Sequence, residues 1–91
     1  MEMKHEDNFI NLYDGEKLAG HIEYVVMENN VIDVIHTIVS EDYQGQGIAG
    51  KLFKELVTYV KTNNLKMIPT CSYIKHQIDK NPELNELTVN Q

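Results

Sequence analysis

The sequence predicts an α+β fold with a single mixed β-sheet, an antiparallel meander followed by a βαβ unit, and two main helices. Apolar segments at residues 8–13 and 18–26 flank an Asp14-Gly15 turn, which is typical of a β-hairpin. After a glycine-rich stretch, the apolar spacing changes from strand-like to helical. An apolar segment at residues 65–70 then follows the helix, and a strand–helix–strand crossover makes that strand parallel to the one before the helix.

The third predicted strand covers residues 31–39 and begins after an Asn29-Asn30 turn. It is rich in β-branched residues and almost continuously apolar. This composition predicts a central strand that is buried on both faces of the sheet.

The first predicted helix carries Ile48, Leu52, Leu56 and Val60 at four-residue spacing and ends at Asn63-Asn64. These residues form one apolar face, which packs on the sheet.

The second predicted helix starts at Ser72, taken as its N-cap, and stops at Asn81-Pro82. We expect one domain over residues 1–91, with residues 1–7 and 83–91 as peripheral tails. Leu84 and Leu87 are the apolar residues that would anchor the second tail.

The length and composition indicate a single small domain in the cytoplasm. The chain has 91 residues, 42% hydrophobic and 24% charged. It has no apolar run near the roughly 20 residues that span a membrane, and its polar first residues are unlike a signal peptide. The single cysteine, Cys71, is predicted to be a free thiol, which suits a reducing compartment.

The net charge of −6 is divided unevenly along the chain. Residues 1–43 hold two lysines and ten acidic residues, whereas residues 44–91 hold six lysines and four acidic residues. An anionic cofactor therefore prefers the second half and a cationic amine the first, although an acidic surface can also serve solubility alone. The chain has no arginine, which argues against nucleic-acid binding.

The glycine-spaced stretch at residues 44–50 predicts an anion-binding turn before a helix. It lacks the Lys-Ser/Thr of a Walker loop. It matches Gly-x-Gly-x-x-Gly of dinucleotide-binding folds, but no acidic ribose ligand follows about 20 residues later. A turn that needs glycine for its geometry alone is the other interpretation.

Residues 44–49, Gln-Gly-Gln-Gly-Ile-Ala, also resemble the acetyl-CoA loop Arg/Gln-x-x-Gly-x-Gly/Ala of the GNAT acetyltransferases. From the Asp14-Gly15 turn to Pro82, the sequence resembles the short, single-domain "YjdJ-type" members of this family. It implies a minimal GNAT-like fold, acetyl-CoA as the acetyl donor and pyrophosphate binding at this loop. The chain has no room for the two helices that longer members place between their first two strands, so we expect an open acceptor site.

The resemblance also implies which residues bind the cofactor. Backbone amides of the loop would face the pyrophosphate, a lysine in the first helical turn would reach a phosphate, and the preceding strand end would pair with the pantetheine arm. The residues are Ile38, Val39, Gln44, Gly45, Gln46, Gly47, Ile48, Ala49 and Lys51.

Cys71 is the first candidate catalytic residue. It lies where a strand meets a helix N-terminus, which stabilises a thiolate, and Lys75 and His76 are close in sequence. The resemblance of residues 69–73, Pro-Thr-Cys-Ser-Tyr, implies a catalytic role, either as an acetyl carrier or in positioning. The alternative is a small buried apolar residue. Tyr73 is a candidate proton donor to the departing thiolate, or a packing residue.

His36 is the second candidate, as a general base, with a buried core histidine as the alternative. Similar proteins often have an acidic residue or glycine two positions later, where this chain has Ile38. Glu23 is a lesser candidate base, and a solvated strand residue is its other interpretation. The histidines are too scattered to predict a metal site.

The function predicted is transfer of acetyl from acetyl-CoA to a small-molecule or peptide amine, by a monomer or weak homodimer. The absence of an acidic residue at position 38 motivates a second hypothesis, a coenzyme-A-binding module with little activity. A structural domain with a vestigial loop is the third.

Overall fold

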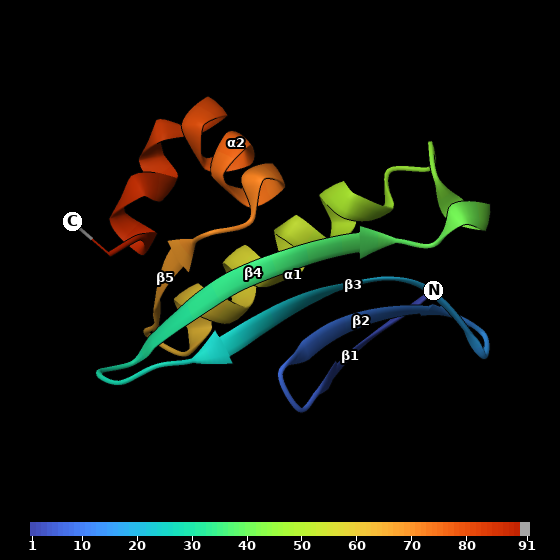
Figure 1. Ribbon diagram of the computed structural model, residues 1–91, viewed down its shortest axis with the longest axis horizontal. Coiled ribbons are helices and arrows are strands. Elements are labelled where there is room, and N and C mark those ends of the chain that lie inside the picture. The colour runs from blue at the N-terminus through green and yellow to red at the C-terminus, as the bar shows by residue number, and fades with distance from the viewer. Residues whose placement is uncertain (90–91) are drawn as a thin grey trace.

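The computed structural model of the protein describes residues 1–89. The order of its elements can be followed in Figure 1: four strands and a 3₁₀ turn, then a helix, a fifth strand, a second helix and a second 3₁₀ turn. The elements are β1 Glu2–Glu6, β2 Phe9–Asp14, β3 Lys17–Val26, β4 Val31–Val39, η1 Glu41–Tyr43, α1 Ile48–Thr62, β5 Lys66–Pro69, α2 Ser72–Lys80 and η2 Pro82–Leu87.

The strands form one sheet in the order β1-β2-β3-β4-β5. The first four pair antiparallel, and β5 pairs parallel to β4 after the α1 crossover. The predicted α+β topology, a meander followed by a βαβ unit, is confirmed.

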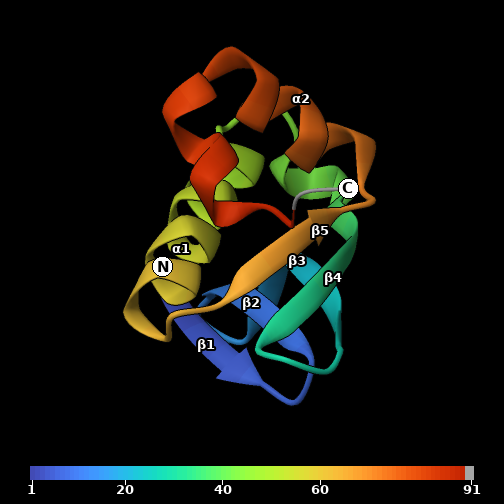
Figure 2. The same ribbon diagram turned by 90° about the vertical axis from the view of Figure 1, so that its left-hand side faces the viewer.

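One hydrophobic core lies between the sheet and the helices. The predicted apolar face of α1 is fully buried at Ile48, Leu52, Leu56 and Val60, and α2 adds two buried isoleucines. Figure 2 shows α1, α2 and η2 gathered on one side of the strands β1–β3. No helix within residues 1–89 is long and apolar enough to cross a membrane.

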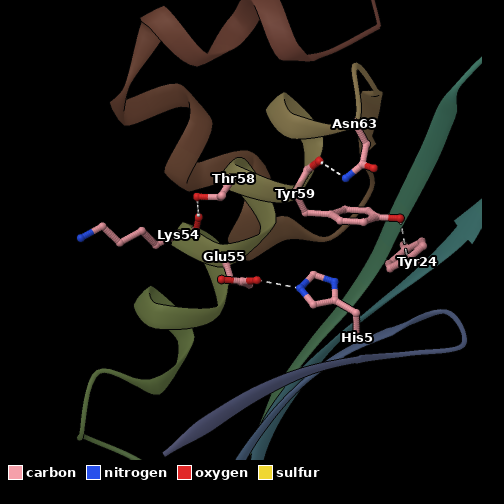
Figure 3. A network of polar contacts seen from close by, with 7 residues as sticks. All are labelled: His5, Tyr24, Lys54, Glu55, Thr58, Tyr59 and Asn63. Atoms are coloured by element: carbon pink, nitrogen blue, oxygen red, sulfur yellow. Dashed lines mark hydrogen bonds and ion pairs between the residues drawn. The ribbon is translucent and has the colours of Figure 1, made fainter.

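The expected N-terminal tail is wrong, because Glu2–Glu6 is the edge strand β1, paired with β2 along its whole length. Its contact with α1 explains why this polar segment is ordered. His5 Nε2 lies 2.6 Å from Glu55 Oε2, and the His5 ring stacks on Tyr59 with 5.0 Å between ring centroids. Figure 3 shows this contact between the strand and the helix.

We expect His5→Ala to lower the free energy of unfolding by about 1 kcal/mol, because it removes a half-exposed, charge-assisted contact and the ring stacking. Urea unfolding would measure the change. Glu2→Ala on the same strand is the matched control, since Glu2 is exposed. Equal effects of the two substitutions would show that the His5–Glu55 contact contributes nothing.

The prediction that β4 is buried on both faces is also wrong. Ile32 and Val34 are buried, but His36 is exposed and Ile38 is 52% exposed. The register with β3 shifts here, so that Glu23 pairs with His36 and Tyr24 with Val34, leaving Ile35 as the extra residue of a bulge. Beyond the bulge the facing of the side chains is reversed, and the apolar Ile38 points away from α1.

We call the side of the sheet away from α1 the outer face. Side chains alternate along a strand, and the buried Ile10, Ile22 and Val34 define the opposite, helix-covered face. The registers then place on the outer face Glu2, Lys4, Glu6, Phe9, Asn11, Tyr13, His21, Glu23, Val25, Asp33, His36 and Ile38.

The second half of the chain also differs from the sequence-based prediction at α2 and after it. The N-cap of α2 is Cys71 rather than Ser72, because Cys71 is extended and its carbonyl accepts the Lys75 amide at 3.0 Å. Most of η2, Pro82–Leu87, falls within the peripheral tail expected over residues 83–91. Leu87 is buried and Leu84 packs on the core, so the expected anchoring is confirmed. Gln91 and Asn90, in the same expected tail, lie outside the described residues.

Candidate active site

The loop before α1 has the geometry of an anion-binding turn. Gly45 and Gly47 have φ angles of +82° and +75°, which lie in the left-handed region that favours glycine. Gly47 is the N-cap of α1, and among the described residues no side chain caps that helix end or places an acidic group in its first turn. The first amides of α1 therefore keep their hydrogen-bonding capacity, at the positive end of the helix dipole.

A surface cavity of about 300 Å³ lies at this loop. Six of the predicted cofactor residues line it, together with one residue that the sequence did not indicate. The lining residues are Val39, Tyr43, Gln44, Gly45, Gly47, Ile48 and Ala49.

The loop is tied to the hairpin between β2 and β3. Tyr43 donates a hydrogen bond to Asp14 Oδ2 at 2.7 Å, which is the main cause of the raised pKa of the Tyr43 phenol. Ser40 Oγ donates to the Leu18 carbonyl at 2.6 Å. These contacts position the loop from a segment 20 to 30 residues earlier. No local pattern in the sequence could have indicated Tyr43.

A gap opens between β4 and β5 next to this cavity. The two strands pair only between Val31–Val34 and Lys66–Pro69, after which β4 continues to Val39 and β5 leads into α2. The Ser40 amide bonds the Ala19 carbonyl on β3. Backbone groups alternate in direction, so those of Thr37 and Val39 face the gap, whereas those of Ile38 face β3.

Cys71 lies at the closed end of the gap. Its amide donates to the Val34 carbonyl at 2.9 Å, and its thiol donates to Thr37 Oγ1 at 3.4 Å. The residue is half-buried and packs against the core. Since Thr37 pairs with the buried Ile22, the thiol lies on the helix-covered side of the sheet.

His36 lies on the other side of the same strand. It is exposed, which rules out the core-histidine alternative, and its direct cross-strand neighbour is Glu23. Adjacent strand residues point to opposite faces. The structure therefore places the two candidate catalytic residues on opposite sides of the sheet, next to one gap.

Three predicted cofactor residues do not line the loop cavity. Lys51 lines a separate groove between α1 and β1 with Met1 and Met3, and Ile38 points to the outer face. The Gln46 side chain donates to the Asp42 carbonyl at 3.3 Å, within the loop itself.

Tyr73 is half-buried at the start of α2, two residues after Cys71. Burial, with a smaller effect of the nearby Cys71, raises the pKa of its phenol above the usual value. The phenol is therefore protonated across the neutral range. Among residues 1–89, no three His, Cys, Asp or Glu side chains are grouped to hold a metal ion.

We expect the protein to lose stability at alkaline pH because of Tyr24, the buried tyrosine of β3. Burial, aided by a hydrogen bond with Tyr59, raises the pKa of Tyr24 to about 12. Unfolded tyrosines ionise near pH 10, so between about pH 10 and 12 the unfolded chain holds fewer protons and the free energy of unfolding falls with pH. Urea unfolding at successive pH values should show a smaller decline for Tyr24→Phe, and an identical decline would contradict the assignment.

The family follows from comparison of the whole chain with known proteins. A model of the GCN5-related N-acetyltransferases matches residues 8–87, from β2 to the end of η2. The chain belongs to this family. The match includes the glycine loop, the gap and both candidate catalytic residues.

Solved structures of GCN5-related N-acetyltransferases have the same fold. A GCN5-like protein from Staphylococcus aureus, determined by NMR, is 34% identical with a TM-score of 0.77, over 99% of this chain and 89% of that one. An acetyltransferase of the GNAT family from Staphylococcus aureus Mu50 is 19% identical with a TM-score of 0.56, over 80% of this chain but only 50% of that one. The second likeness shows the fold alone.

Among curated relatives, Protein NATD1 of Homo sapiens and that of Mus musculus are each 36% identical over 59 residues. The aligned part is 65% of this chain and 52% and 54% of those proteins, respectively, so it spans about half their length.

Proposed function

We propose that the protein transfers an acetyl group from acetyl-CoA to an amine. The observation that carries this proposal is that Val39 belongs both to the loop cavity and to the unpaired end of β4 at the gap. Val39 lines the cavity and directs its backbone into the gap, so one ligand can lie along both. Membership of the GCN5-related N-acetyltransferases supports acetyl-CoA as that ligand.

The residues present fit coenzyme A. The amides of residues 46–49 at the start of α1 suit a pyrophosphate, and the left-handed glycines allow it to approach the backbone closely. The exposed Lys51 adds positive charge in the first turn of that helix. Backbone groups of Thr37 and Val39 offer strand-like hydrogen bonds to the amides of the pantetheine arm.

Acetyl-CoA supplies a thioester, whose carbonyl carbon forms a C–N bond as its C–S bond breaks. His36, beside Glu23, takes a proton from the acceptor ammonium and so frees its lone pair. Tyr73 holds a proton at neutral pH and gives it to the departing sulfur, and the new amide nitrogen then passes its surplus proton to the Tyr73 phenolate. Cys71, bonded to Thr37, borders the gap on the helix-covered side.

Release of free coenzyme A in the presence of an amine and peptide panel tests the proposal. We expect release above spontaneous thioester hydrolysis, and a loss of about a hundredfold in kcat for His36→Gln. His76→Gln is the matched control, because His76 is exposed and lies in the middle of α2, more than one turn beyond Cys71 at the gap. If no acceptor causes release of coenzyme A above spontaneous hydrolysis, the proposed transferase activity is wrong.

A coenzyme-A-binding module is the second candidate function. Among residues 1–89 the His36 ring has no hydrogen-bond partner to orient it, which a general base usually has. Tight binding of acetyl-CoA without turnover would favour the module over the enzyme.

The role of Cys71 is tested by intact mass after incubation with acetyl-CoA. If the thiol carries acetyl, the wild-type mass rises by one acetyl group and Cys71→Ala does not gain it. A wild-type protein that turns over while unmodified would limit Cys71 to positioning. Loss of fold in the variant is checked by its urea midpoint.

A further inference from the structure

The outer face combines acidic and apolar side chains next to the gap. A row of register partners crosses the sheet from β1 to β4, as Glu6, Phe9, Glu23 and His36 in turn. His21 lies next to this row, and its ring packs edge-on against that of Phe9 with 5.2 Å between ring centroids. Beyond His21 lies Ile38, which is 52% exposed.

Glu6 is held in place while remaining open to a ligand. Asn11 and Tyr13 both donate to its Oε1 atom, at 3.0 Å and 2.9 Å, and these bonds, with a smaller effect of the nearby Lys4, lower the pKa of the carboxyl group. Among residues 1–89, no bond is formed by its Oε2 atom, and no ion pair by Glu6 or Glu23. A fixed carboxylate with a free oxygen is prepared to accept a cationic donor without further ordering.

The two sides of the gap are suited to different ligands. The loop cavity and Cys71 lie on the helix-covered side, where the proposed acetyl donor binds. His36 borders the gap from the outer face. An acceptor that reaches the gap from the outer face meets the Glu23 carboxylate and the apolar Ile38 beside the gap, whereas Lys4 lies across the sheet on β1.

We propose that the outer face binds a cationic polypeptide and delivers one of its amines past His36 into the gap, with Glu6 and Glu23 binding its positive charges. This inference rests on the proposed acetyl transfer and names its acceptor class. A polypeptide fits better than a small amine, because the face is a strand surface with exposed apolar side chains such as Ile38 rather than an enclosed pocket.

The strand register also fixes the distance between Glu6 and His36, and therefore the spacing of basic residues in a peptide that binds both. Glu6 and His36 are three strand spacings apart, roughly 14 Å, and an extended chain advances roughly 3.3 Å per residue. A second basic residue about four positions from the acetylated amine therefore reaches Glu6.

The test is a titration of the ¹⁵N-labelled protein, saturated with coenzyme A, with an eight-residue peptide carrying lysines at positions 2 and 6 and leucine between them. We expect shifts at Phe9, Glu23 and His36. Glu6→Gln and Glu23→Gln should each weaken binding about two- to fivefold, since exposed ion pairs contribute that much. Glutamine at position 6 retains an oxygen to accept the Asn11 and Tyr13 bonds, so the fold is kept.

Glu83→Gln on η2 is the matched control, an exposed carboxylate away from the sheet, and it should leave the dissociation constant unchanged. The proposal is overturned if a peptide with glutamates in place of the lysines binds equally well, if Glu83→Gln has the same effect, or if the shifts map elsewhere. Spermine binding more tightly than the peptide would instead assign the face to small polyamines. Calorimetry with coenzyme A separates the two claims, because cofactor binding without peptide binding overturns the acceptor alone.

Discussion

Gly47→Ala is expected to weaken coenzyme A binding at least tenfold. The residue is the N-cap of α1 with a φ of +75°, where an L side chain costs about 1–2 kcal/mol. Space is not the obstacle, because an added Cβ atom would meet nothing within 4 Å. The loop therefore relieves the strain by changing its backbone, which turns the amides at the helix start away from the pyrophosphate.

Gly50→Ala is the matched control for this prediction. It adds the same methyl group three residues later, also with nothing within 4 Å, but inside α1 and without a left-handed φ. We expect it to stabilise the protein by about 0.5–1 kcal/mol and to leave the dissociation constant unchanged. Calorimetry with coenzyme A compares the two variants. If wild type and Gly47→Ala bind coenzyme A with equal affinity, the loop is not part of the coenzyme A site.

Gly20→Ala is expected to be the most destabilising small substitution in the sheet. An added Cβ atom at this buried position of β3 would lie 2.8 Å from the Ile38 carbonyl oxygen and 2.9 Å from Ile48 Cγ2. The first of these is backbone of β4, so a strand or the start of α1 must move. Overpacking of this kind costs about 1–3 kcal/mol.

Thermal unfolding measures the effect of Gly20→Ala. In a chain of this size about 4–8 °C of melting temperature is lost per kcal/mol, and Gly50→Ala serves again as the control without a clash. Coenzyme A binding should weaken as well, because Ile48 begins the helix that holds the pyrophosphate. A melting temperature within 2 °C of wild type would contradict the close approach of α1 to β3 at Gly20.

The sequence was most informative where one residue type decides the local structure. Gly45 and Gly47 stand in the conformations that their spacing indicated, and the four-residue periodicity of α1 matched its buried face. β1 was missed because its residues, Glu-Met-Lys-His-Glu, have little apolar periodicity. Its order comes from pairing with β2 and from Glu55, which lies 50 residues away from His5.

The features of the site that were missed depend on tertiary structure. The bulge at Ile35 reverses the facing of the rest of β4, which exposes His36 and separates it from Cys71. No residue type at that position indicates a bulge, because isoleucine is an ordinary strand residue. Tyr43 enters the loop cavity through its bond to Asp14, a partner in another hairpin.

A ¹⁵N titration with acetyl-CoA shows whether one ligand occupies the loop and the gap together. We expect saturable shifts of the amides of residues 46–49 at the helix start, and of Thr37, Val39 and Cys71 at the gap. The amides of the edge strand β1 should not shift. No saturable shift at millimolar acetyl-CoA, or shifts confined to a surface away from both the loop and the gap, would contradict it.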